Sequence, residues 1–329
     1  MGNAGNEFHV KEQHIVSRTL LKQFAKKGPK GWTLVSFNLE RPNHKHRERS
    51  IRACGKTESF VRHESASIEK LWNDLVEQKA AAAISAAQGA RAVPPESVIK
   101  SLKDLITLHL VRSHWYQNVH DNSFITSFDR LGSRLLLEKG EEIKRRALFA
   151  TGLHLETANA LRFYIDRFMR ESEPAQDYAS GKLFRTSIED TFFKMRDLVS
   201  SWGVEILRPE AGRFIIGDSP AMTICLDGQR IKSYKMAVGE ANSVLLPIGP
   251  TCLLALGSNT VLGSIPETWV DQANELQIRA ARKYVYLHPD SRAENFVRAT
   301  LRVTPTMADS SSVRQKLATQ RPGGLHRHR

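Results

Sequence analysis

The spacing of apolar residues changes at Trp202-Gly203, and this change limits the fold more than any other feature of the chain. Before it, apolar residues recur at helical spacing, most clearly across residues 96–119. After it, short apolar runs are separated by Gly, Pro or Asp, which is typical of strands in a mainly antiparallel sheet. These runs are residues 204–207, 214–216, 222–226, 243–247 and 252–256.

Further signals place elements on both sides of this boundary. Residues 32–38 are rich in β-branched and aromatic residues and predict a strand, with a second strand expected around 50–53. We predict an α+β fold with a small N-terminal strand unit, a helical middle and a C-terminal, mainly antiparallel sheet with a closing helix. The expected helices are residues 15–26, 65–88, 96–119, 122–150, 155–172, 183–202 and 266–284, with a polar linker at 173–182.

Length and composition fit one large domain. A chain of 329 residues with 41% hydrophobic residues can bury a sizeable core. We predict a single domain over residues 9–303, with a helical middle at 64–202 and a β-rich part at 203–260. Residues 1–8 and the basic tail at 304–329 are expected to be disordered, the tail because Ser, Thr, Pro, Gly and cations dominate it.

The net charge of +13 is concentrated at the two ends of the chain. Residues 1–63 carry 13 Lys and Arg against 5 Asp and Glu, and residues 303–329 carry 5 against 1, so the segment between them is close to neutral. Basic ends favour phosphate backbones and acidic partners. We therefore expect nucleic acid or an acidic partner, with solubility and no specific partner as the alternative.

Several protein classes are disfavoured by motifs that the chain lacks. Cys54, Cys225 and Cys252 are scattered and form no CxxC pair, which indicates a reduced, cytoplasmic protein. The sequence holds no run of 18 apolar residues and no signal-peptide pattern, so we expect no membrane partner. It holds no zinc motif, Walker loop or dinucleotide-binding glycine pattern either, and we expect no metal and no cofactor.

The strongest candidate for a functional site lies near the start of the chain. On a helix over residues 15–26, His14, Arg18 and Lys22 would follow one another at intervals of four and line one face. An imidazole suits acid–base chemistry near neutral pH, and an arginine fork with a nearby lysine suits a phosphate. The alternative is a solvated cationic face with His14 bonded to the backbone.

Other candidates lie far along the chain. Gly217-Asp218-Ser219-Pro220 follows an apolar run, so Asp218 and Ser219 would sit at a strand end, either in a site or in ordinary turn hydrogen bonds. Arg112 follows an apolar helical stretch and could point toward a site or into solvent. Asn274 lies within an apolar helical frame, where its amide needs partners and could tie the helix to sheet loops.

The order of these motifs resembles a mostly bacterial domain-of-unknown-function family, over about residues 9–290. Members open with a His-x-x-Pro-Arg/Gln-x-x-Leu-Lys-x-Phe motif and carry a later Ser-Asp-x-Pro turn. His14, Arg18, Leu21, Lys22 and Phe24 match the opening motif, and the turn at Asp218 matches the later one. Ser17 replaces the family proline and is a suitable helix N-cap. The resemblance implies that the separated motifs belong to one domain and converge in space.

Two functional hypotheses follow, and the sequence does not decide whether the protein is an enzyme. In the first, the protein is a metal-independent nuclease or acts on another phosphate-bearing substrate. His14 and Asp218 would be catalytic, Arg18, Lys22 and Arg112 would bind phosphate, and Ser219 and Asn274 would support them. In the second, the protein is a non-enzymatic binding or interaction module. Its His/Arg/Lys row is then a structural network, with Arg18 paired to Asp218.

Overall fold

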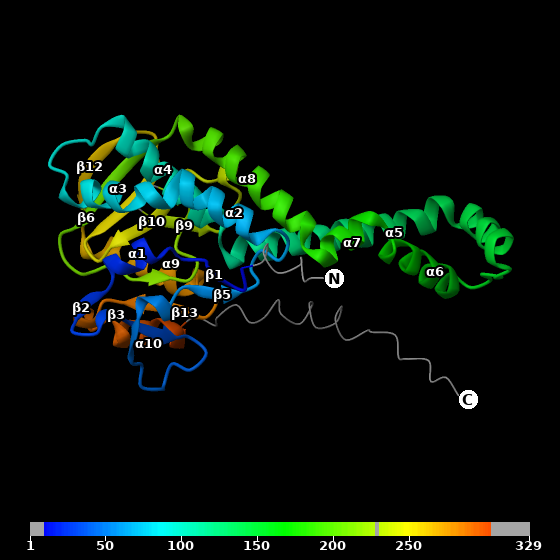
Figure 1. Ribbon diagram of the computed structural model, residues 1–329, viewed down its shortest axis with the longest axis horizontal. Helices are drawn as coiled ribbons and strands as arrows, with labels where there is room; N and C mark the ends of the chain where they lie inside the picture. The colour runs from blue at the N-terminus through cyan, green and yellow to red at the C-terminus, as the bar shows by residue number, and fades with distance from the viewer. Residues whose placement is uncertain (1–9, 228–229, 304–329) are drawn as a thin grey trace, which may run out of the picture.

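The computed structural model describes residues 10–227 and 230–303, and the predictions for residues 1–8 and 304–329 fall outside these ranges. The chain is an α+β protein, as predicted, with N-terminal strands, a helical middle and a C-terminal, mainly antiparallel sheet with a closing helix (Figure 1). The extent of the single domain stays a prediction.

The N-terminal part consists of short strands around one short helix. Ser17 is the N-cap of α1, because its hydroxyl accepts a hydrogen bond from the Leu20 amide at 3.3 Å. The helix therefore begins at Arg18, and the prediction of a helix over residues 15–26 is wrong at both ends. The elements are β1 (Glu12–His14), α1 (Arg18–Gln23), β2 (Lys26–Gly28), β3 (Gly31–Asn38), β4 (Glu48–Ser50), the 3₁₀ turn η1 (Ile51–Ala53) and β5 (Lys56–Glu58).

The middle of the chain is helical, with two departures from the predicted boundaries. The expected helix at 96–119 breaks at Arg112-Ser113, where the Ser113 hydroxyl caps a new helix. The expected linker at 173–182 is largely helix, since Pro174 stands in a first turn, where proline is tolerated. The elements are α2 (Ser65–Trp72), the π-helical turn η2 (Asn73–Glu77), α3 (Gln78–Gly89), α4 (Glu96–Val111), α5 (His114–Thr151), α6 (Ala158–Arg170), α7 (Glu173–Ser180) and α8 (Lys182–Ser200).

The C-terminal part forms a six-stranded sheet in the order β12-β6-β11-β10-β8-β9, antiparallel except for the β12–β6 pair. Edge strands β9 and β12 were not predicted, because they carry the polar and glycine residues that weaken a strand pattern. The elements are β6 (Gly203–Pro209), β7 (Ile216–Gly217), β8 (Met222–Asp227), β9 (Arg230–Tyr234), η3 (Val238–Glu240), β10 (Ser243–Gly249), β11 (Cys252–Gly257), β12 (Val261–Ile265), α9 (Glu267–Ala280), β13 (Tyr284–Leu287), η4 (Pro289–Ser291) and α10 (Glu294–Val303).

A second sheet joins the two ends of the chain. Its order is β2-β3-β13-β7, and β4 also pairs with β3. The register of β3 with β13 places Val35 opposite Leu287 and Phe37 opposite Val285. Strands β2, β3 and β4 thus belong to the same sheet as β13, the strand that follows α9, whereas β1 and β5 pair with each other in a separate two-stranded sheet.

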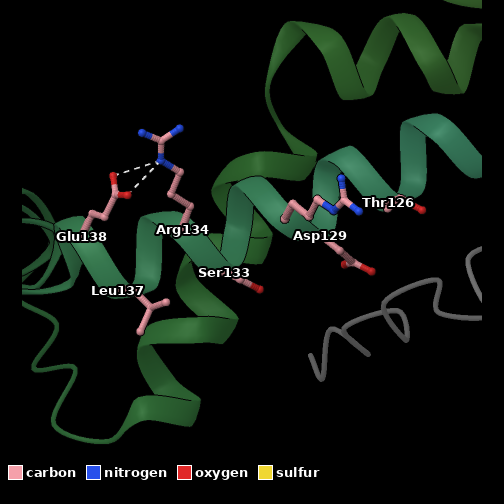
Figure 2. Close-up of a pocket in the computed structure, with 7 residues that line it drawn as sticks. Thr126, Asp129, Ser133, Arg134, Leu137 and Glu138 are labelled. Atoms are coloured by element: carbon pink, nitrogen blue, oxygen red, sulfur yellow. Dashed lines mark hydrogen bonds and ion pairs between the residues drawn. The ribbon is translucent and has the colours of Figure 1, made fainter.

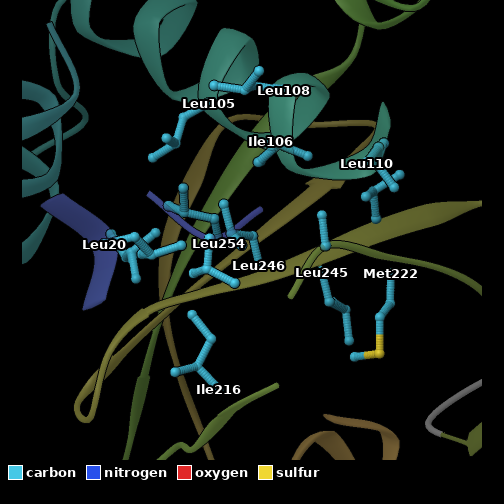
Figure 3. Close-up of a cluster of buried hydrophobic side chains, with 14 of the residues drawn as sticks. Leu20, Leu105, Ile106, Leu108, Leu110, Ile216, Met222, Leu245, Leu246 and Leu254 are labelled. Atoms are coloured by element: carbon cyan, nitrogen blue, oxygen red, sulfur yellow. The ribbon is translucent and has the colours of Figure 1, made fainter. Parts of the chain in front are cut away.

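The main core lies between the six-stranded sheet and the helices around it. Leu20 of α1, Leu105 of α4 and Leu246 of β10 belong to this fully buried cluster (Figure 3). Truncating a leucine in such a core costs about 2–5 kcal/mol of stability. Helix α1 is therefore anchored in the core by its apolar face, and Arg18 and Lys22 on its polar face are exposed.

Helices α5 and α6 extend away from this body as a hairpin (Figure 1). The hairpin has a small core of its own, in which Leu161, Ile165 and Met169 are buried. Gly132 and Gly140 allow the helices to approach closely, since a Cβ at Gly140 would lie 3.2 Å from Leu161 Cδ2. In the described part of the chain, no helix combines the length and the apolar character needed to cross a membrane.

Candidate functional site

His14 lies at the end of strand β1, opposite Lys56 of β5. Its ring is half-buried, and within the described residues its buried Nε2 atom has no hydrogen-bond partner. Burial, and then the charges of Arg18, Arg112 and Lys56, lower the pKa of His14 to about 4. The imidazole is therefore neutral at physiological pH and has an unused nitrogen.

The three residues of the predicted row do not lie on one helical face. His14 precedes the Ser17 cap and belongs to a strand, whereas Arg18 and Lys22 lie on α1. Arg18 and Lys22 are exposed, and the Lys22 ammonium lies 5.0 Å from the centre of the Trp32 ring. Arg18 nevertheless lies close enough to His14 for its charge to act on the imidazole.

Arg112 is fully buried at the break between α4 and α5, where its guanidinium meets two carboxylates. Its Nη2 atom donates to Glu77 Oε1 at 2.5 Å, and its Nη1 atom lies 3.6 Å from Glu69 Oε2. The guanidinium also lies 5.4 Å from the centre of the Trp72 ring. Arg112 thus holds together two segments of the helical middle through its two Nη atoms, whereas its buried Nε atom has no hydrogen-bond partner within the described residues.

The π-helical turn η2 explains how both carboxylates reach the same arginine. In a regular α-helix, a residue eight positions further along is rotated by about 80° around the axis. The extra residue of a π turn reduces this rotation to about 20°. Because η2 ends at Glu77, it brings Glu77 onto nearly the same face as Glu69.

His109 of α4 is hydrogen-bonded to Ser17, the N-cap residue of α1. Its Nδ1 atom lies 2.9 Å from the Leu105 carbonyl oxygen, and its Nε2 atom accepts a hydrogen bond from the Ser17 amide at 3.2 Å. These contacts require a neutral ring that carries its proton on Nδ1. Burial, followed by the charge of Arg112, lowers the pKa of His109 to about 4.

The buried, neutral His109 predicts that acid destabilises the protein. An unfolded chain binds a proton on this residue near pH 6.5, whereas the folded chain does so only near pH 4. The stability contributed by the neutral ring is therefore present above pH 6.5 and is lost as the pH falls toward 4, by about 3 kcal/mol. Urea unfolding between pH 7 and pH 4 measures this loss. H109Q should flatten the dependence, and equal slopes for H109Q and wild type would contradict the assignment.

Asp218 does not reach His14 or Arg18, which corrects both predicted partnerships. It is 3% exposed, and its carboxylate accepts hydrogen bonds from three consecutive backbone amides. Those donors are Arg282 at 2.7 Å, Lys283 at 2.8 Å and Tyr284 at 3.0 Å. The physical reason is that an Asp at a strand end meets backbone amides that need acceptors where α9 gives way to β13, whereas Arg18 is exposed on α1.

Asp218 acts on the His14 strand only through intermediates. The same turn leads into β13, whose Tyr286 hydroxyl accepts a hydrogen bond from the Gly55 amide at 2.8 Å. The Gly55 carbonyl oxygen in turn accepts from the Ile15 amide at 2.8 Å, next to His14. The Asp218 turn and the segment that follows His14 are therefore connected through Tyr286 and Gly55, without direct contact between Asp218 and His14.

Asn274 and Ser219, the two predicted supporting residues, differ in their hydrogen bonding. Asn274 bridges α9 to the strand before the turn: its Oδ1 accepts from the Ile215 amide and its Nδ2 donates to the Arg213 carbonyl, both at 2.9 Å. Within the described residues, the buried hydroxyl of Ser219 has no hydrogen-bond partner. Asn274 therefore ties the helix to a sheet loop, away from His14.

A shallow groove lies elsewhere, along α5. Its volume is about 530 Å³, and Arg134 and Glu138 form a two-oxygen ion pair at 3.0 Å on one edge (Figure 2). None of the predicted site residues borders it. The lining residues are Thr126, Asp129, Arg130, Ser133, Arg134, Leu137 and Glu138.

A family model described as "Protein of unknown function (DUF4238)" matches residues 12–291, which is most of the chain. The protein belongs to the DUF4238 family. This match confirms the predicted membership of a domain-of-unknown-function family. No curated protein and no solved structure matches the chain.

Sequence reasoning missed the two glutamates of this DUF4238 chain that surround Arg112. A sequence signal for Glu69 was present, since the apolar residues Trp72 and Val76 follow it at the helical intervals of three and seven. For Glu77 no local signal exists, because the π turn that redirects it does not follow from residue spacing. In the described residues, no group of three His, Cys, Asp or Glu side chains is arranged to hold a metal ion.

Proposed function

We propose that this DUF4238 protein acts on a phosphate-bearing substrate, foremost nucleic acid, with nuclease-like chemistry at His14. The observation that carries the proposal is the neutral imidazole, with its buried, unpartnered Nε2 atom, under the influence of Arg18, Arg112 and Lys56. A neutral imidazole accepts a proton, and cations around it attract a phosphate. The excess of cations in residues 1–63 supports an anionic substrate.

In this mechanism, His14 takes the proton of the attacking hydroxyl or water as the new bond to phosphorus forms. Arg18 is exposed and makes no ion pair within the described residues, so its fork is available for two phosphate oxygens. Lys22 adds a second exposed cation on the same helix. Arg112 supplies charge from below the surface, because its own hydrogen bonds go to Glu77.

The test is cleavage of end-labelled RNA and DNA by the wild-type protein, H14A and R18A. We expect H14A to lose at least 100-fold of the rate, the range typical of a lost general base. R18A should raise KM more than it lowers kcat, since it binds phosphate. R130A, on the α5 groove, is the matched control and should behave as wild type. Equal products from wild type and H14A, or none from either, would refute the proposal.

A non-enzymatic binding module is the second candidate. It is favoured by the finding that Arg112 and Asp218, two of the predicted site residues, have all their strong contacts inside the protein. In this case the protein retains labelled RNA or an acidic peptide without cleaving it. H14A would then leave the dissociation constant unchanged, whereas R18A would weaken it.

A further inference from the structure

The surface formed by residues 18–52 carries a large excess of positive charge. This segment holds ten Lys and Arg residues against two acidic ones, and all ten basic side chains are exposed. Within the described residues only Lys26 among them forms an ion pair. Glu40 pairs with Lys283 instead, and Glu48 accepts a hydrogen bond from a threonine hydroxyl. The charge of this surface is therefore largely uncompensated by the protein itself.

The charges of the α5–α6 hairpin are arranged differently. Its basic side chains commonly pair with a carboxylate one turn along the same helix, which neutralises them within the surface. Examples are Arg134–Glu138, Arg146–Glu142 and Arg162–Asp166. The surface at residues 18–52, rather than the hairpin, thus keeps its charge available for an anionic partner.

Trp32 of β3 lies among these cations. The Lys22 ammonium lies 5.0 Å from the centre of the indole ring. Lys27 of β2 is directly opposite Trp32 in the antiparallel pairing, so the two side chains stand on the same face of the sheet. On the other side of β3, Arg49 of β4 is opposite Leu34, which shares this face because it is two positions from Trp32. Three cations from three elements therefore lie around one partly exposed indole.

An aromatic ring among cations suits single-stranded nucleic acid better than other polyanions. An unpaired base stacks on the ring, while ammonium and guanidinium groups contact the phosphates on either side of it. The bases of a duplex are already stacked on one another and are not free to do so. Anionic lipid fits less well, since no large apolar side chain is exposed within residues 18–52 to enter a membrane surface.

The same surface continues along α1 toward His14. Lys22 and Arg18 lie one helical turn apart, and both are exposed. Arg18 directly follows the Ser17 cap, which is three positions from His14 at the end of β1. A strand that passes over Trp32 can therefore follow the cations of α1 to the imidazole.

We propose that Trp32, Lys22, Lys27 and Arg49 form a binding surface for single-stranded nucleic acid, with one base stacked on the indole and the cations on the neighbouring phosphates. This inference rests on the proposed function, since it names the form of nucleic acid that reaches His14. Binding itself requires no cleavage, so it can be measured separately.

Two labelled strands separate stacking from charge: a thymidine strand of about 12 nucleotides and an abasic strand of the same length and charge. Fluorescence anisotropy measures their dissociation constants, with every variant made in the H14A background so that no strand is cleaved. W32A should weaken binding of the thymidine strand about 5-fold or more and leave the abasic strand unchanged. W32F keeps a ring and should retain most of the affinity. W269A, the matched control, removes a partly exposed tryptophan from α9 and should change neither constant.

The cations are tested by the salt dependence of binding. K22A, K27A and R49A should weaken both strands to a similar extent, and each should reduce the slope of log Kd against log salt by about 0.7. K100A is the matched control, because Lys100 is exposed on α4 and makes no ion pair within the described residues. Its slope should equal that of the H14A parent.

Quenching of tryptophan fluorescence tests stacking without a truncation that could unfold the protein. The thymidine strand should quench the H14A parent and its W269F variant, but should quench W32F much less. If binding depends on Trp32 but wild type cleaves no nucleic acid, the proposed function fails while the binding surface stands. Equal losses of W32A on both strands, undiminished quenching in W32F, or tighter binding of phosphatidylserine vesicles than of the thymidine strand would overturn the inference.

Discussion

R112M is expected to lower the free energy of unfolding by about 3–5 kcal/mol, the range for removing one partner of a buried ion pair. The fully buried guanidinium satisfies Glu77 at 2.5 Å and lies near Glu69 at 3.6 Å. Methionine fills much of the same space but leaves two largely buried carboxylates without a cation. Their mutual repulsion then adds to the cost of desolvation. Urea unfolding followed by far-ultraviolet circular dichroism measures the change.

R18M is the matched control, because it makes the same substitution at an exposed arginine. It should change the free energy of unfolding by no more than about 0.5 kcal/mol. The double variant R112M/E77Q should be less destabilised than the sum of the single variants, since the carboxylate left unpaired by R112M is gone. Similar effects of R112M and R18M would show that the buried pair is unimportant.

The second large effect is expected for D218A, which should lower the free energy of unfolding by about 3 kcal/mol or more. Its carboxylate accepts hydrogen bonds from the partly buried Arg282, Lys283 and Tyr284 amides, and each donor that loses this acceptor costs about 1 kcal/mol. D218N keeps one acceptor oxygen and should fall between D218A and wild type. Because Tyr286 on β13 accepts a hydrogen bond from Gly55, D218A should also loosen the strand that carries His14.

Hydrogen exchange locates this effect. In D218A the amides of residues 282–284 should lose protection first, under conditions in which the core of α4 stays protected. D290A is the control, since Asp290 is half exposed and its ion pair with Lys26 lies on the surface. Unchanged protection at 282–284 would contradict the role assigned to Asp218.

The sequence predicted those helices and strands whose pattern lies within a few neighbouring residues. The change in apolar spacing after Trp202-Gly203 marks the start of the six-stranded sheet, and the strand at 32–38 is present as β3. The sequence predicts Ser17 as a cap, yet the predicted helix starts at residue 15, two positions before this cap. The cap itself shows why this was wrong, because residues before it take extended conformations, and His14 therefore belongs to a strand.

The candidate site was only partly predictable, because several of the residues around it come from distant parts of the chain. His14 and Arg18 were predicted because their chemistry is visible in the sequence, and Arg18 lies close enough for its charge to act on the His14 imidazole. Their companions Glu69 and Glu77 depend on a π turn and on Arg112, which is 35 positions from Glu77. The prediction that Arg18 pairs with Asp218 failed because the backbone amides at 282–284 meet the carboxylate first.

The sequence by itself determined the class of fold, the Ser17 cap and the positions of most helices and strands, since these depend on residues a few positions apart. Only the tertiary structure decided which side chains meet. Ser17 binds His109 across 92 positions, and Gly55 binds Tyr286 across 231. Such contacts follow from how buried polar groups find partners once the core has formed, and no local pattern records that outcome.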